Sequence, residues 1–275
     1  MTPVEQAAAD GAIGGRLWLY ANYHCNLACR YCLTESAPAV PRRQLPVDQL
    51  PELAREARKI GFTALGVTGG EPFLVRGLPA ALAAMARELP VVVLSNGTLF
   101  GGRLLAQLSV LTGLDVAVQI SLDSADPDVN DEMRAPLNFA KVVGAIPRLR
   151  ELGLRVRIAT TTQGLPPGEL ARLCELHRSL GVADEDHVVR PIVRRGRAVD
   201  HGLGVSASLA DLPAELTITT DGAFWSPFGP TVHGGRLDTD LLITRAVRPL
   251  SIPAAAMLKV AGGAPAAGGS ELKIC

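Results

Sequence analysis

The segment Tyr23-His24-Cys25-Asn26-Leu27-Ala28-Cys29-Arg30-Tyr31-Cys32 carries three of the five cysteines of the chain, at Cys-x3-Cys-x2-Cys spacing. Three thiolates on one short loop can bind three irons of a [4Fe–4S] cluster, and the fourth iron then keeps an open coordination position for a substrate or cofactor. A zinc site is the alternative for the same cysteines, but it requires four ligands, usually in two pairs. His24, Cys174 or His177 would have to supply the fourth ligand, because the sequence contains no second pair.

The hydrophobic pattern around this segment alternates between strands and helices. Short apolar runs that are rich in β-branched residues predict six strands, at 16–20, 64–67, 91–94, 116–122, 154–160 and 187–193. Runs with helical spacing lie between them, at 48–60, 78–89, 103–111, 139–152 and 169–180. This order predicts an α/β fold in which parallel strands are joined by right-handed crossovers. Reactive groups are then expected at the carboxyl ends of the strands.

Three polar or glycine-rich groups follow successive predicted strands. They are Gly69-Gly70-Glu71-Pro72, Ser95-Asn96-Gly97 and Ser121-Leu122-Asp123. The glycines allow a close approach of the backbone, and the Glu71 carboxylate suits an ammonium group. Each group alone is typical of an ordinary turn or helix cap. Their occurrence at successive strand ends favours one shared site.

Together, these features resemble the radical SAM superfamily, whose signature is Cys-x3-Cys-x-aromatic-Cys with Tyr31 in the aromatic position. The resemblance covers residues 16–200 and implies a partial (β/α)6 parallel barrel. It implies that Cys25, Cys29 and Cys32 bind a [4Fe–4S] cluster, and that S-adenosylmethionine (SAM) binds its open iron. The residues that we expect at the cofactor are Tyr31, Gly69, Gly70, Glu71, Pro72, Ser95, Asn96, Ser121, Asp123, Ile158 and Arg190.

Some of these roles leave an alternative open. The resemblance places the Gly69-Gly70-Glu71-Pro72 group near the amino group of SAM. Ile158 would either contact adenine or belong to the hydrophobic core. Arg190 and the arginines up to residue 197 would either bind an acidic group of the cofactor or substrate, or form a solvated basic edge.

The region beyond residue 200 departs from the βα pattern. Residues 216–225 predict a hairpin with its turn at Asp221-Gly222. Similar hairpins in SPASM and twitch relatives carry cluster cysteines, whereas Ser226 stands near that position here. We therefore expect residues 201–275 to form a degenerate twitch-like cap and a flexible tail, and residues 1–15 to be an N-terminal extension. The aromatic residues at 224, 225 and 228 would line the substrate chamber or form a small core under the cap.

Two cysteines lie outside the cluster segment. Cys174 falls on a predicted helix, where a buried packing thiol is expected. Cys275 is the last residue and follows a stretch rich in glycine and alanine. Cys275 would either return over the active site as a hydrogen-atom donor or extra ligand, or have no role.

The composition limits the classes of partner. Lys+Arg and Asp+Glu are both 27 in 275 residues, so bulk charge supplies no reason to expect a nucleic-acid partner. No uncharged apolar run is long enough for a transmembrane helix, and the first fifteen residues lack the basic region of a signal peptide. We therefore expect a cytoplasmic protein without a membrane partner.

The resemblance implies an enzyme that reductively cleaves SAM to methionine and a 5′-deoxyadenosyl radical. A one-electron donor such as flavodoxin or ferredoxin would supply the electron. The radical would abstract a hydrogen atom from a small-molecule or peptide substrate in natural-product or cofactor biosynthesis. The lack of auxiliary-cluster cysteines favours redox-neutral chemistry such as epimerisation, rearrangement or decarboxylation. The alternatives are a ribosomal-peptide maturase with a separate recognition partner, and a non-catalytic or zinc-binding structural module.

Overall fold

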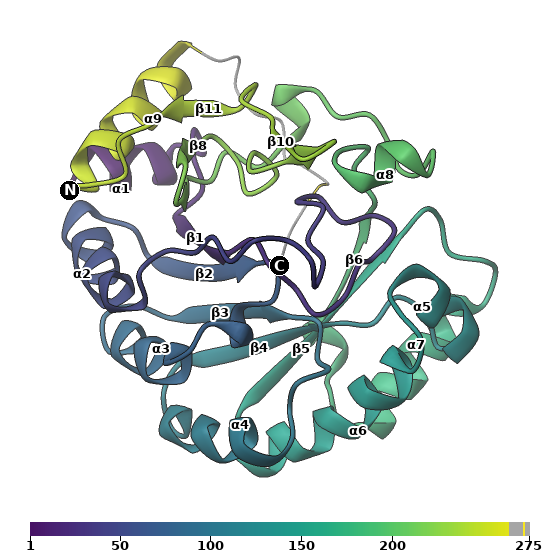
Figure 1. Cartoon of the computed structure of the whole chain (residues 1–275). Coiled ribbons are helices and arrows are strands. Elements are labelled where there is room, and N and C mark those ends of the chain that lie inside the picture. Colours follow the sequence, from purple (N-terminus) through teal and green to yellow (C-terminus); the bar gives the residue numbers. More distant parts are fainter. Residues whose placement is uncertain (264–271, 273–275) are drawn as a thin grey trace.

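The computed structural model describes residues 1–263 and residue 272. Cys275 and the tail from residue 264, apart from residue 272, lie outside the described residues. The described chain forms one nine-stranded sheet in the order β11-β8-β7-β1-β2-β3-β4-β5-β6, and a separate two-stranded ribbon (Figure 1).

Six parallel strands make up the predicted partial barrel, and each pairs with the next one along the chain. The strands are β1 (Arg16–Asn22), β2 (Ala64–Gly69), β3 (Val91–Ser95), β4 (Val116–Ser121), β5 (Arg155–Thr162) and β6 (His187–Pro191). Most residues of β1 to β5 are buried, as expected for strands that are covered on both faces. The predicted α/β fold is confirmed.

Helices follow the outside of this curved sheet (Figure 1). The predicted ones are α2 (Leu50–Ile60), α3 (Leu78–Ala86), α4 (Gly102–Gln107), α6 (Asn138–Glu151) and α7 (Glu169–Ser179). Helix α2 shows why they form, because its residues at helical spacing, Leu50, Leu53 and Ala57, are buried against the sheet. Gly61 ends α2 in the left-handed conformation, with φ of 112°.

Four helices were not predicted: α1 (Pro3–Ala9), α5 (Pro127–Met133), α8 (Arg197–Asp200) and α9 (Ser251–Gly263). Helix α5 is short and polar, and Asn130 is its one buried residue, so hydrophobic periodicity does not reveal it. Its start is nevertheless encoded locally, because the Asp126 side chain accepts hydrogen bonds from the backbone N–H groups of Asp128 and Val129. Single 3₁₀ turns lie at Val47–Gln49, Pro72–Leu74, Leu108–Leu111, Asp184–Asp186 and Leu209–Asp211.

The C-terminal part continues the sheet at the free edge of β1. Strand β7 (Thr217–Thr219) pairs with β1 in parallel, and β8 (Gly222–Phe224) returns antiparallel to β7, which confirms the predicted hairpin with its turn one residue earlier, at Thr220-Asp221. Strand β11 (Leu242–Thr244) adds to β8, while β9 (Val232–His233) and β10 (Arg236–Leu237) form the separate ribbon. Helix α9 lies beside α1 at this end of the molecule (Figure 1). The description of this part as a twitch-like cap stays a prediction.

None of the helices in the described part of the chain is both long and apolar enough to cross a membrane.

Candidate active site at the carboxyl ends of the strands

A cavity of about 180 Å³ lies where the carboxyl ends of the parallel strands meet the cysteine segment. Most of the residues predicted at the cofactor line it. They are Cys25, Cys29, Tyr31, Cys32, Gly69, Gly70, Ser95, Asn96, Ser121 and Arg190. Residues separated by more than 150 positions in the sequence therefore share one chamber, as the strand-end argument predicted.

The three cysteines reach this chamber on residues 23–36, which we call the cysteine loop. Cys25 is buried, and its sulfur accepts hydrogen bonds from the backbone N–H of Leu27 at 3.3 Å and from Asn96 Nδ2 at 3.5 Å. Burial raises the pKa of the Cys25 thiol to about 12. Burial also raises the pKa of Cys29 to about 11, although the nearby Arg134 opposes this. Both thiols therefore carry protons at neutral pH that a bound metal has to displace.

The three thiols are not arranged around one shared ion in this structure. Sulfurs that share one Zn²⁺ at about 2.3 Å lie about 3.8 Å apart. Among the described residues, the one group of such ligand atoms that all lie within 4.8 Å of one another is Glu35, Asp200 and His233, on the surface. The three cysteines do not form such a group, and three thiolates without a fourth ligand match three irons of a cube. The donor set fits a [4Fe–4S] cluster.

The two glycines after β2 allow the cysteine loop to pack closely on the strand ends. A Cβ atom on Gly70 would lie 2.1 Å from the carbonyl oxygen of His24, and one on Gly69 would lie 2.4 Å from that of Asn22. Neither position accepts a side chain without moving the backbone that leads to Cys25. Both glycines line the cavity.

Glu71 differs from the expectation that its carboxylate meets an ammonium group. The carboxylate is fully buried and accepts hydrogen bonds from the backbone N–H groups of Phe73 at 3.1 Å and Asn96 at 2.8 Å, and from Ser95 Oγ at 3.0 Å. Burial raises its pKa to about 7, while these hydrogen bonds lower it. Neither Glu71 nor the buried Pro72 lines the cavity. Glu71 therefore ties the end of β2 to the end of β3.

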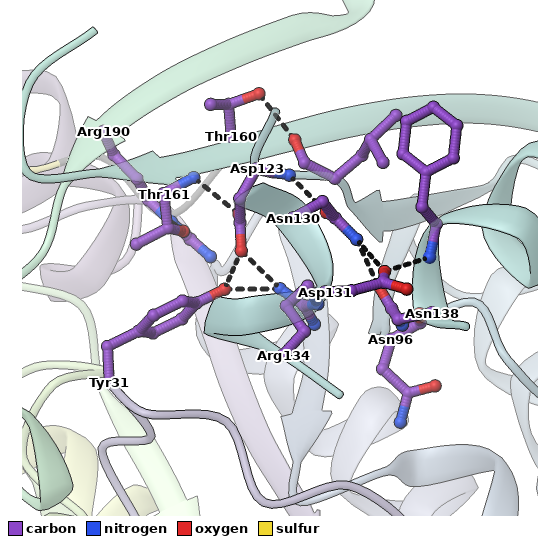
Figure 2. A network of polar contacts seen from close by, with 12 residues as sticks. Tyr31, Asn96, Asp123, Asn130, Asp131, Arg134, Asn138, Thr160, Thr161 and Arg190 are labelled. Atoms are coloured by element: carbon purple, nitrogen blue, oxygen red, sulfur yellow. Dashed lines mark hydrogen bonds and ion pairs between the residues drawn. The ribbon is translucent and has the colours of Figure 1, made fainter. Parts of the chain in front are cut away.

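Asp123 also lies behind the cavity wall, in a network shown in Figure 2. One of its carboxylate oxygens accepts hydrogen bonds from Tyr31 Oη at 2.5 Å and from Arg134 at 3.1 Å. Its other oxygen accepts one from the backbone N–H of Thr161 at 3.0 Å. Arg134 also donates a hydrogen bond to Tyr31 Oη. Asp123 thus links β5 and the end of α5 to the cysteine loop.

Arg134 is the functional candidate that the sequence pattern missed. It follows the unpredicted helix α5, its side chain is only 5% exposed, and it lines the cavity. Its Nε is buried and has no hydrogen-bond partner among the described residues. Its counter-charge is Asp123, and as a cation in the cavity wall Arg134 suits an anionic group of a bound molecule.

Comparison with known proteins agrees with this geometry. The model of the radical SAM superfamily matches residues 20–177. The chain belongs to the radical SAM superfamily. Enzymes of this superfamily use a [4Fe–4S] cluster and SAM. SuiB of Streptococcus suis, which has been solved with bound S-adenosylmethionine, shares the fold with a TM-score of 0.57 at 15% identity. The match covers 75% of this chain and 47% of SuiB.

Two curated relatives have different activities. The chain is 28% identical over 201 residues to a GTP 3′,8-cyclase of Rhodopseudomonas palustris, which covers 71% of this chain and 58% of the relative. It is 30% identical over 147 residues to the mycofactocin maturase MftC of Mycolicibacterium smegmatis, over 52% of this chain and 37% of the relative. The chain thus spans only about half the length of the curated relatives that it matches.

The remaining predicted residues of this radical SAM chain occupy different places. Ile158 is fully buried in the hydrophobic core and does not line the cavity. Arg190 does line it, and its Nε donates to Thr161 Oγ1 at 3.0 Å. All three aromatic residues after β7 belong to the buried core, and Phe228 alone of them also lines the cavity.

Two arginines after β6 and the cysteine on α7 lie outside the cavity. Arg194 donates to the carbonyl oxygen of Gly204, and Arg195 forms ion pairs with Asp238 and Asp240. These two arginines therefore contact the protein itself. We expected Cys174 on α7 to be buried, but the structure shows it half-buried.

Proposed function

We propose that the chain binds SAM in this cavity and uses it to abstract a hydrogen atom from a substrate. When bound, the cluster and SAM supply a reductive cleavage that yields methionine and a 5′-deoxyadenosyl radical. The observation that carries the proposal is the convergence of three separate cysteines, the carboxyl ends of β2, β3, β4 and β6, and one buried guanidinium on a single cavity.

The thiolates of Cys25, Cys29 and Cys32 would hold three irons and leave the fourth open. Arg134 would bind the carboxylate of SAM, because its guanidinium group lies in the cavity wall beside the cysteine loop and a charge-assisted hydrogen bond suits such a pair. Backbone groups of Gly69 and Gly70 would accept hydrogen bonds from the amino group. This arrangement gives the amino group a neutral environment, because the Glu71 carboxylate is used elsewhere.

The nucleoside end of SAM would lie along the ends of β3 and β4. Ser95 and Asn96 line the cavity at the end of β3 and Ser121 lines it at the end of β4, so they would contact the ribose. Arg190, at the end of β6, would bind an acidic group of the substrate or of SAM. The barrel residues exclude water from the radical.

The substrate would enter beside the C-terminal part of the chain. Tyr20, Pro227 and Phe228 form one wall of the cavity, and Tyr20 Oη donates to the carbonyl oxygen of Pro227 at 3.0 Å. We propose that residues 201–263 act as a cap and that Phe228 contacts a small molecule or a peptide side chain. Residues 201–263 contain no cysteine, which supports a redox-neutral reaction such as epimerisation, rearrangement or decarboxylation. A flavodoxin or ferredoxin would supply the electron.

The second candidate is a ribosomal-peptide maturase that works with a separate recognition partner. It is supported by the similarity to MftC, which is a maturase. SuiB, which has also been solved with its precursor peptide SuiA, shares the fold with a TM-score of 0.58. The GTP 3′,8-cyclase relatives point instead to a small molecule.

The test is anaerobic reconstitution with iron and sulfide, followed by SAM and dithionite. The wild type is expected to form 5′-deoxyadenosine and methionine in equal amounts. Cys29→Ala is expected to form neither, while Cys174→Ala, a cysteine outside the cavity, matches the wild type. A cluster without 5′-deoxyadenosine would support the non-catalytic alternative, and bound zinc in place of iron would support the structural one.

A further inference from the structure

The turn after β6, at Gly196 and Arg197, packs against the cysteine loop and donates hydrogen bonds to its backbone. One terminal nitrogen of the Arg197 guanidinium donates to the carbonyl oxygen of Cys29 at 2.6 Å, and the other donates to that of Ser36 at 3.1 Å. The backbone N–H of Arg197 donates to the carbonyl oxygen of Cys32 at 3.0 Å. One residue therefore holds three carbonyl groups that span the second half of the loop.

The neighbouring Gly196 makes this contact possible. Its backbone has φ of 57° and ψ of −139°, a conformation that residues with a side chain rarely adopt. A Cβ atom at this position would lie 2.3 Å from the carbonyl oxygen of Leu33 and 2.6 Å from that of Cys32. The turn thus lies directly against the backbone of the loop, with no room for a side chain between them.

The cysteine loop has little regular structure of its own to hold its shape. Within the loop, the backbone N–H of Cys32 donates to the carbonyl of Cys29 at 3.2 Å, and that of Glu35 donates to the carbonyl of Cys32 at 3.4 Å. No helix or strand is assigned between β1 and residue 43 in this described stretch. The loop depends on external partners, because three thiolates must be held in one arrangement before iron binds.

A second external partner holds the other side of the loop. The backbone N–H of Val232 in β9 donates to the carbonyl oxygen of Leu33 at 3.0 Å. The backbone N–H groups of Gly234 and Gly235 donate to the Glu35 carboxylate, each at 2.9 Å. The loop therefore lies between the turn after β6 and the β9–β10 ribbon, and Arg197 is its bidentate side-chain contact.

We propose that Gly196 and Arg197 form a clamp that pre-shapes the cysteine loop for the cluster. The proposal rests on the proposed function of Cys25, Cys29 and Cys32 as cluster ligands. Arg197 is a positioning residue, because its hydrogen bonds go to carbonyl oxygens and leave the thiols available for iron. A planar fork that bridges two carbonyl groups is a property of arginine that lysine does not share.

The direct test is hydrogen exchange of the cluster-free protein, followed by mass spectrometry of peptides that cover residues 25–36. Arg197→Gln removes the charge and the fork, and Arg197→Lys keeps the charge but removes the fork. Both are expected to speed exchange in this peptide, Arg197→Gln roughly tenfold and Arg197→Lys by less, because the bridge between the carbonyl groups of Cys29 and Ser36 no longer opposes local opening. Exchange in β3 and β4 is expected to stay at the wild-type rate.

Arg194→Gln is the matched control. It removes the same charge from the same turn, but Arg194 contacts the carbonyl of Gly204 and no residue of the cysteine loop. This variant is expected to exchange as the wild type does. Wild-type exchange of residues 25–36 in both Arg197 variants would overturn the clamp. Global unfolding of Arg197→Gln leaves Arg197→Lys as the deciding variant.

Cluster assembly provides the second readout. Both Arg197 variants are expected to take up iron and sulfide more slowly than the wild type and Arg194→Gln. Uptake at the wild-type rate in a variant whose loop exchanges faster would also overturn the claim that the clamp serves assembly. A wild-type protein that binds no cluster would instead contradict the proposed function, while the exchange data still decide whether the clamp shapes the loop.

Discussion

Replacing Asp123 by Asn is expected to destabilise the cluster-free protein by about 3 kcal/mol. The Asp123 and Arg134 side chains are 4% and 5% exposed, so the change leaves a guanidinium buried without its counter-charge. Breaking a buried ion pair by removing one partner typically costs about 3–5 kcal/mol. The lower end applies here, because the Asn oxygen can still accept the hydrogen bond from the backbone N–H of Thr161.

Urea unfolding of the cluster-free protein measures this loss. The double variant Asp123→Asn with Arg134→Gln removes both charges. Its loss in free energy of unfolding is expected to be about 2 kcal/mol smaller than the summed losses of the two single variants. Asp184→Asn is the control, because Asp184 pairs with Arg178 on the surface and should change stability little. A loss below about 1 kcal/mol for Asp123→Asn would refute the view that this network anchors the cysteine loop.

Two further predictions concern other buried groups. Burial and the neighbouring His187 lower the pKa of His177 to about 3. The unfolded chain therefore binds a proton below about pH 6.5 that the folded protein does not, and about 2 kcal/mol of stability is lost between pH 7 and pH 5. Urea unfolding should show that His177→Phe lacks this loss, and an unchanged pH dependence would contradict it. Gly70→Ala should lower the melting temperature and prevent cluster binding, because its Cβ would meet the His24 carbonyl. At Gly144 in α6, no atom would lie within 4 Å of an added Cβ. Gly144→Ala should therefore leave cluster binding unchanged and keep or slightly raise the melting temperature. Equal melting temperatures and equal cluster binding of the two variants would refute the packing argument.

The strand order and the cavity lining were predictable because both follow from local patterns. A run of β-branched residues predicts β3. In a parallel sheet the carboxyl ends of neighbouring strands lie at one edge, so the residues that follow β2 at Gly69 and β3 at Ser95 must lie close together. The cysteine spacing likewise needs no tertiary information, since all three ligands lie within eight positions.

The roles of Glu71, Arg134 and Arg197 could not be predicted in this way. A carboxylate after a strand suits an ammonium group or backbone N–H groups equally well, and only the position of β3 decides that Glu71 meets the latter. Arg134 is carried by a short polar helix without hydrophobic periodicity. Arg197 donates to backbone carbonyl groups more than 160 positions away. Every residue has such a group, so the sequence does not indicate which ones Arg197 contacts.

Electron paramagnetic resonance of the reconstituted, dithionite-reduced protein, with and without SAM, shows whether SAM binds to the open iron of the cluster. Three cysteine ligands leave one iron open, so SAM is expected to bind it and change the spectrum of the reduced cluster. The same change should be absent in Cys29→Ala and retained in Cys174→Ala. A reduced cluster whose spectrum is identical with and without SAM would show that the cluster has no open iron for SAM.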